Sequence, residues 1–187
     1  DDGSAVFGMS IVKNLDSARP WAVQHRSLGG TSYLRLDSTN SSFTAIDRWN
    51  NTGATTTQLT LGTASWTNEV GLDFISYNFA HNPTKGIFCG SYTGTGAAGN
   101  KITTGFPVGW VMIKRTSGAA DWWLLDVKRG MTGATQPYLR ANTTAAEAST
   151  SFVVTETDGF TVNITGVDAN GSGETYIFMA IADPAQF

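Results

Sequence analysis

Gly8-Met9-Ser10-Ile11-Val12-Lys13 recurs 101 positions later in the chain as Gly109-Trp110-Val111-Met112-Ile113-Lys114. Both stretches begin with a glycine, continue mainly with aliphatic residues and end with a lysine. Aliphatic and β-branched residues favour extended strands, and glycine favours the turns that lead into them. The pair therefore predicts two equivalent β-strands, one in each half of the 187-residue chain.

The correspondence continues on both sides of these stretches, with a four-residue insertion in the second half. The shared residues are mostly glycine, aromatic and aliphatic, the types that form turns and cores. The sequence therefore predicts one architectural unit that occurs twice. The further matching pairs are Trp21 and Trp122, Gly29 and Gly130, Tyr33-Leu34-Arg35 and Tyr138-Leu139-Arg140, and residues 74–80 and 176–182.

Short strand-like runs lie between turns rich in Gly, Ser, Thr and Asn, which predicts an all-β sandwich or barrel. We expect a first lobe at residues 1–84 and a second lobe at residues 85–187. Residues 86–96 match nothing ahead of Asp1, so we expect the first lobe to lack its leading strands or to take them from another part of a longer chain. The expected strands are residues 10–13, 21–25, 33–36, 58–61, 74–79, 111–115, 122–126, 152–155, 160–164 and 176–181.

Composition excludes several classes of protein. The formal net charge is only −3, with 12 Lys and Arg against 15 Asp and Glu. Without a basic cluster, nucleic acid and anionic membranes are not expected partners. The chain has no run of about eighteen consecutive apolar residues, so the sequence predicts no membrane-spanning helix. The single Cys89 excludes a disulfide within the chain.

Four stretches, in their order along the chain, carry a resemblance to a known family. They resemble the repeated β-rich modules found near the ends of tail-fibre and other virion structural proteins of tailed bacteriophages. The resemblance implies an antiparallel sandwich like the lectin-like jelly rolls and laminin-G-like domains, a place on the virion surface, host attachment and a trimeric assembly. It brings no set of binding residues with it. The stretches are residues 105–115, residues 122–126 with Arg129-Gly130, residues 158–162 and residues 170–177.

Two glycine-rich segments resemble ligand loops, but each lacks a required part. Residues 94–99 satisfy G-x-G-x-x-G, yet no apolar-periodic helix follows, so we expect a surface loop. Residues 168–174 offer oxygen ligands at alternate positions, yet the twelfth position of a calcium loop would be Met179, so we expect a hairpin. Because His25 and His81 have no nearby ligand cluster, we predict neither a metal site nor a cofactor.

Paired carboxylates could in principle hydrolyse a glycosidic bond. The candidates are sparse and lie in turn-like sequence, so we expect solvated surface side chains, no catalytic residue and a protein that is not an enzyme. A polysaccharide depolymerase remains an alternative. The carboxylates considered are Glu69, Asp73, Glu147, Glu156 and Glu174.

Four of the six tryptophans have no tryptophan at the matching position of the other half, whereas Trp21 and Trp122 match and are expected in the core. An indole ring among amides and hydroxyls suits a sugar, whose apolar ring face stacks on it. We therefore predict carbohydrate binding at the unmatched residues. The alternative is that they cover the ends of the sandwich or fill a subunit interface. The unmatched residues are Trp49, Trp66, Trp110 and Trp123.

These observations lead to one expected function and two alternatives. We expect a tail-fibre or surface-appendage module of a bacteriophage virion, assembled as a homo-oligomer beside other virion proteins, that contacts a host-surface glycan. Low charge and many polar uncharged residues suit such a surface. The first alternative is a purely structural head-decoration or tail-assembly protein. The second is the depolymerase.

Overall fold

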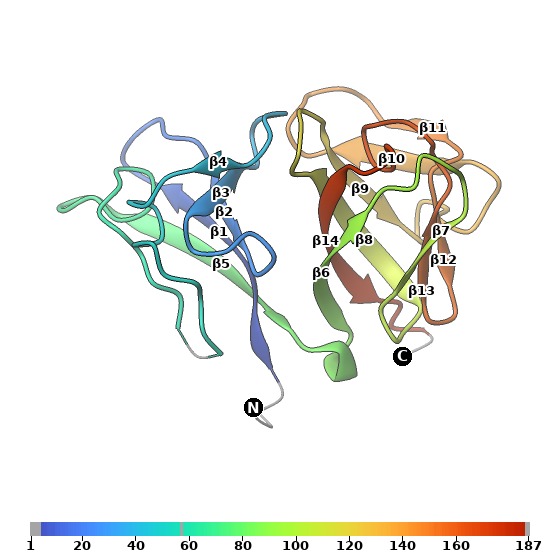
Figure 1. Ribbon diagram of the computed structural model, residues 1–187, viewed down its shortest axis with the longest axis horizontal. Helices are drawn as coiled ribbons and strands as arrows, with labels where there is room; N and C mark the ends of the chain where they lie inside the picture. The colour runs from blue at the N-terminus through green and yellow to red at the C-terminus, as the bar shows by residue number, and fades with distance from the viewer. Residues whose placement is uncertain (1–4, 57, 186–187) are drawn as a thin grey trace.

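The computed structural model describes residues 5–56 and 58–185, and in these residues the chain is all-β. Every strand pairing is antiparallel, and the strands form three sheets arranged in two lobes (Figure 1). The predicted antiparallel β-sandwich is therefore confirmed, and the jelly-roll detail stays a prediction. A three-residue 3-10 turn, η1 (Pro83–Lys85), links the last strand of the first lobe to the second lobe.

The first lobe holds one five-stranded sheet with the order β4-β3-β2-β1-β5. Side chains on an interior strand, β1, alternate between two apolar layers, because successive residues of a strand point to opposite faces. Met9 and Ile11 point toward the second lobe, whereas Val12 points to the outer face. The strands are β1 (Val6–Asn14), β2 (Ala22–His25), β3 (Ser32–Arg35), β4 (Phe43–Thr44) and β5 (Phe74–His81).

The second lobe is a sandwich of a six-stranded and a three-stranded sheet. The larger sheet has the order β11-β10-β9-β8-β14-β6, and the smaller has the order β12-β13-β7. Phe152, Phe160 and Phe178 meet in the fully apolar layer between them. The strands are β6 (Ile87–Thr93), β7 (Asn100–Thr103), β8 (Val108–Arg115), β9 (Trp122–Asp126), β10 (Gln136–Arg140), β11 (Ala148–Thr150), β12 (Val153–Glu156), β13 (Gly159–Val162) and β14 (Thr175–Ala182).

The internal repeat is visible in the order of the strands. Five strands of the larger sheet, β11-β10-β9-β8-β14, run in the same order as β4-β3-β2-β1-β5 in the first lobe. The second lobe has one strand more in this sheet, because β6 pairs with the outer edge of β14. The division of the chain at residue 84 stays a prediction.

The outer face of the first sheet packs against a different element from the one that covers the larger sheet of the second lobe. In place of a three-stranded sheet, an irregular segment after β4 packs Trp49 and Leu59 against Val12, Ala22 and Tyr33. Residues 58–61 belong to this segment and form no strand, so that part of the prediction is wrong. Leu59 and Leu61 alternate with polar neighbours, as in a half-buried strand, but a strand also needs a neighbouring backbone to pair with, and Leu61 stays exposed.

The two lobes share an apolar core, which we call the interlobe core. Met9, Ile11 and Val23 pack there with Met112 and Trp122, and the matching faces of the two repeats are the ones that meet. Burying so many apolar side chains between the lobes favours one united structure.

Hydrogen bonds also join the lobes directly. Trp122 Nε1 donates to the Arg35 carbonyl at 2.8 Å. Lys114 is fully buried, and its ammonium donates to the Thr39 carbonyl at 2.9 Å and to the Ala120 carbonyl at 2.7 Å. Burial lowers the pKa of Lys114 to about 8. At neutral pH the side chain is therefore still an ammonium group, which can donate both hydrogen bonds.

The two glycine-rich segments pack against each other as structural loops. Buried Asn170 accepts from the Thr95 backbone N–H at 2.9 Å and donates to the Ala97 and Ile164 carbonyls. A Cβ on Gly94 would lie 2.1 Å from the Gly171 carbonyl oxygen, so glycine is needed for this close approach. In residues 5–56 and 58–185, no helix has the length and apolar character needed to cross a membrane.

Candidate functional site

Two of the four tryptophans predicted to bind carbohydrate are buried in cores. Trp49 has no exposed surface, and its Nε1 donates to the Ser32 carbonyl at 3.1 Å. Trp123 is 5% exposed and packs edge-on against Phe152 in the core of the second lobe. Stacking on a sugar requires an exposed ring, whereas each of these indoles fills an apolar layer beneath a sheet. Neither ring is accessible for stacking on a sugar.

The other two are partly buried in separate places. Trp66 lies on the outer face of the first sheet, with the guanidinium of Arg48 at 4.4 Å and that of Arg35 at 5.6 Å from its ring centroid. Trp110 packs against the interlobe core. The structure therefore brings the four residues to three different apolar clusters and forms no common site from them.

A groove does form beside the start of β1. It consists of two adjoining hollows of about 490 and 540 Å³ that share Val6, Phe7, Thr55 and Thr56 as a common wall. We call this pair of hollows the β1 groove. Their sizes fall within the roughly 300–1,000 Å³ range typical of ligand sites.

Every described residue that lines the second hollow is uncharged. Leu59 and Leu61 contribute apolar surface, whereas Gln58 and Asn78 contribute side-chain amides. Phe79 also borders the hollow, although its side chain packs against the interlobe core. Hydroxyls of threonine and serine complete the wall. A charged ligand would lose its hydration here without gaining an opposite charge, so the lining favours a neutral ligand with both hydroxyls and apolar faces. The remaining lining residues are Ala5, Val6, Phe7, Thr55, Thr56, Ser76 and Ala80.

The position of the groove follows from a tight turn between β2 and β3. Gly29 adopts a φ of 74°, and its carbonyl accepts from the Gln24 side-chain amide at 3.1 Å. At Gly30 a Cβ would lie 2.3 Å from the Thr52 carbonyl carbon, so only glycine lets the following segment pass this close. The turn thereby holds the chain that continues to Thr55 and Thr56 over β1.

The first hollow is bordered by His25, which links the two lobes. His25 has no exposed surface, and its Nε2 lies 3.2 Å from the Phe178 carbonyl on β14. Its Nδ1 accepts from the Ser27 backbone N–H at 3.2 Å, which assigns the ring proton to Nε2. Burial lowers the pKa of His25 to about 4, and the positive charge of Arg26 acts in the same direction. The ring is therefore neutral near pH 7.

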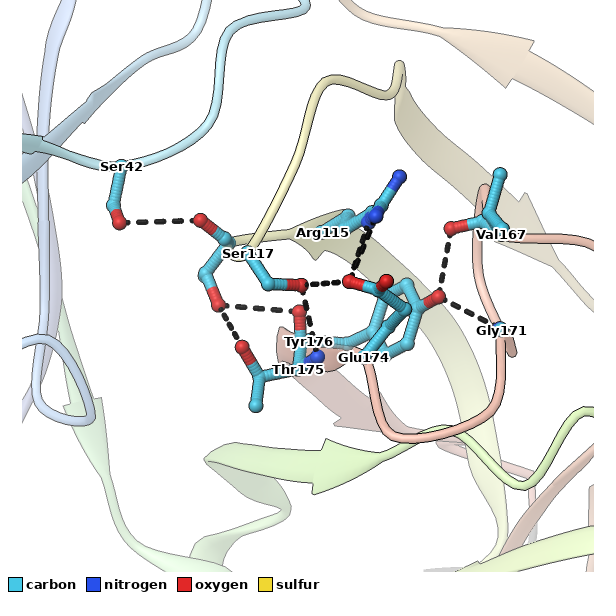
Figure 2. Close-up of polar contacts among 9 residues, drawn as sticks. Ser42, Arg115, Ser117, Val167, Gly171, Glu174, Thr175 and Tyr176 are labelled. Atoms are coloured by element: carbon cyan, nitrogen blue, oxygen red, sulfur yellow. Dashed lines mark hydrogen bonds and ion pairs between the residues drawn. The ribbon is translucent and has the colours of Figure 1, made fainter.

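A polar cluster lies where the loop after β8 meets the start of β14, next to Ser42 of the first lobe (Figure 2). Figure 2 shows Glu174 between Arg115 and Ser117; the Arg115 guanidinium lies 2.7 Å from the carboxylate. Hydrogen bonds from Ser117 and Arg115 lower the pKa of Glu174. A glycosidase acid requires a raised pKa, so Glu174 lacks the environment of a proton donor.

The other candidate carboxylates are dispersed. Glu147 pairs with Arg129 at 3.2 Å, and Glu156 accepts from the Thr161 hydroxyl at 2.9 Å. None of the described residues lining the β1 groove is Asp or Glu. Among the described residues there is also no group of three or more His, Cys, Asp or Glu that could hold a metal ion.

Sequence reasoning missed the β1 groove. Its residues come from β1, β2, β5 and the irregular segment, and no motif connects them along the chain. The available signal was the Gly29-Gly30 pair, which marks a turn that a neighbouring backbone approaches closely.

The fold and groove define a two-lobed, all-β protein with a surface groove lined mainly by uncharged side chains. A family model described as a domain of unknown function (DUF7483) matches residues 4–184, and the chain belongs to this family. No curated protein matches the chain, and no solved structure does. The resemblance to phage tail-fibre modules therefore stays a prediction.

Proposed function

We propose that the protein is a non-catalytic carbohydrate-binding module of a virion surface appendage, and that the β1 groove binds an uncharged glycan of the host surface. The observation that carries the ligand class is that every described residue lining the second hollow is uncharged, with the amides of Gln58 and Asn78 beside Leu59 and Leu61. A sugar presents hydroxyls around its rim and C–H groups on its faces, so it complements such a lining. The place on a virion is supported by the sequence resemblance alone.

The amides are available to a ligand. Gln58 and Asn78 are exposed side chains. The side-chain oxygen of Asn78 accepts from the Ser76 hydroxyl at 3.0 Å, which orients the amide N–H groups outward from the strand. An oriented amide at Asn78 and a second exposed amide at Gln58, beside apolar surface, suit the hydrogen bonding and stacking of carbohydrate recognition.

The test combines a glycan array with affinity measurements on the double variant Gln58→Ala/Asn78→Ala. Loss of two hydrogen bonds, each contributing about 1 kcal/mol, weakens binding by tenfold or more. The melting temperature stays close to that of the wild type because both side chains are exposed. Asn163→Ala is the matched control, since Asn163 lies outside the groove and its truncation leaves affinity unchanged.

Two results would overturn the proposal. One is that the wild type binds no neutral host polysaccharide. The other is that the double variant binds as tightly as the wild type. Release of reducing ends from a polysaccharide would instead favour the depolymerase.

A purely structural virion protein is the second candidate. The observation that favours it is the burial of Trp49 and Trp123 inside the chain, which removes two aromatic platforms from the surface. Antibody labelling of assembled particles separates the two candidates, because a receptor-binding module is labelled at an exposed tip and a buried structural part is not.

A further inference from the structure

Strand β5 forms a long and unprotected edge of the first sheet. Proteins protect sheet edges with short strands, lysines, prolines or bulges. β5 has eight residues, Phe74–His81, and contains no Lys, Arg, Pro or Gly. Among the described residues, β1 is the strand that pairs with it, and its other side pairs with none. Ile75 and Tyr77 are 37% and 47% exposed along this edge.

The other sheet edges in the described part of the chain are shorter. β4 has two residues, β11 three, and β12 and β7 four each. β6 has seven, and Gly90 interrupts it. The exposed apolar edge is therefore concentrated at β5.

The second lobe shows what covers the equivalent edge. β14 corresponds to β5 in strand order, and β6 pairs with it in antiparallel fashion from Thr175–Thr93 to Ile181–Ile87. This pairing places β14 inside the sheet, and six of its eight residues are buried. The same architecture in the first lobe lacks this strand within the described residues.

The sequence of β5 is complementary to itself when two copies run antiparallel about Tyr77. Ile75 then faces Phe79 of the other copy on one side of the sheet, and Ser76 faces Asn78 on the other. Apolar side chains would thus contact apolar side chains, and hydrogen-bonding side chains would contact each other. Cross-strand pairs of these two kinds stabilise a sheet. No like charges oppose each other, because the strand has none at these positions.

We propose that the free edge of β5 is a dimer interface, at which a second copy of this chain pairs its own β5 antiparallel about a two-fold axis through Tyr77. The contact joins the two five-stranded sheets into one. An isologous pair uses the same edge on both copies and closes as a dimer, the commonest symmetric assembly. Ser76 and Asn78 of this strand also line the second hollow, whereas Tyr77 lines neither hollow, so a Tyr77 variant tests the dimer without altering the proposed glycan site.

Sedimentation equilibrium over a range of concentrations tests the assembly. We expect the wild type to dimerise and Tyr77→Lys to weaken dimerisation at least tenfold, because two lysines would face each other across the axis. Val70→Lys, at a position 99% exposed outside β5, adds the same charge and leaves the dimer intact. A wild type that is monomeric at every concentration, or trimeric, would overturn the proposal.

Cysteine cross-linking tests the register without adding charge. Oxidation of a mixture of Ser76→Cys and Asn78→Cys chains should give a disulfide-linked dimer of the two variants, since these positions face each other. A mixture of Ser76→Cys and Val70→Cys is the control and should give little product. Native Cys89 is fully buried and does not compete. A dimer that Tyr77→Lys leaves unchanged and that lacks the 76–78 cross-link would refute this interface.

Discussion

Acidification is expected to destabilise the protein through His25, and the variant His25→Gln isolates this effect. The imidazole is fully buried between β2 and β14, with Nε2 donating to the Phe178 carbonyl and Nδ1 accepting from the Ser27 N–H. Protonating Nδ1 would break the contact with Ser27 and place a charge in an apolar core. Arg26 and His81 oppose that charge further. The folded protein therefore resists binding this proton.

The magnitude follows from the pKa. A fall from 6.5 in the unfolded chain to about 4 in the folded chain corresponds to about 3 kcal/mol, at roughly 1.4 kcal/mol per pKa unit. Above pH 6.5 His25 is neutral in both states and does not change the free energy of unfolding. As the pH falls from 6.5 toward 4, only the unfolded chain takes up the proton, so the free energy of unfolding decreases. Below pH 4 both states are protonated and the loss stops growing.

Urea denaturation followed by tryptophan fluorescence at a series of pH values measures this loss. Between pH 7.5 and 4 the wild type should lose about 3 kcal/mol more than His25→Gln, which cannot titrate there. Burial also lowers the pKa of His81, the other histidine of the chain, so His81→Gln serves as the matched control. All three proteins have the same carboxylates, so the comparison isolates the substituted histidine.

Parallel stability curves for wild type and His25→Gln would refute this reasoning. A direct measurement is also available, because the chain has only two histidines and His81→Gln assigns both ring signals in an NMR titration. A His25 ring that titrates above pH 6 in the folded protein would show that its burial does not exclude the proton.

Two further predictions concern side chains inside the cores. Trp49→Ala should lower the free energy of unfolding by about 3–5 kcal/mol, because it empties a fully buried site and leaves the Ser32 carbonyl unpaired. Trp66→Ala should lower the free energy of unfolding by less, since that ring is only partly buried. Urea denaturation of the two variants makes the comparison. Lys114→Met should lower the free energy of unfolding by about 1–3 kcal/mol, because it leaves the Thr39 and Ala120 carbonyls unsatisfied. Lys13 occupies the equivalent position of the first repeat and is only partly buried, so Lys13→Met should lower it by less than about 1 kcal/mol. Equal losses in either pair would contradict the assigned burial.

Most central strands could be predicted because their alternation coincides with a pairing partner. Residues 10–13 and 111–115 lie in β1 and β8, which are interior strands in both sheets. Residues 58–61 show a similar alternation, but they form no strand because no neighbouring backbone pairs with them. β7 could not be predicted from periodicity, since Asn100–Thr103 carries a single buried apolar side chain, Ile102. Pairing partners distant in sequence decide such cases.

The tryptophans show why a site is harder to predict than a fold. Trp49 and Trp66 have no counterpart in the linear alignment, and the absence of a match suggested a role outside the scaffold. At the position of β2 that corresponds to Trp123 the first lobe has Ala22, and the space above it is filled from the irregular segment by Trp49.

The arginine of the repeated Tyr-Leu-Arg motif shows a second case, in which the other loop tryptophan, Trp66, contacts the arginine as Trp123 does in the second lobe. Arg35 lies 5.6 Å from the ring centroid of Trp66, and Arg140 lies 4.9 Å from that of Trp123. Each lobe therefore places an indole under the equivalent arginine, although one indole comes from a strand and the other from a loop. Residues that fail to align can still do the same structural work, so a surface role must be argued from exposure and from the lining of a groove.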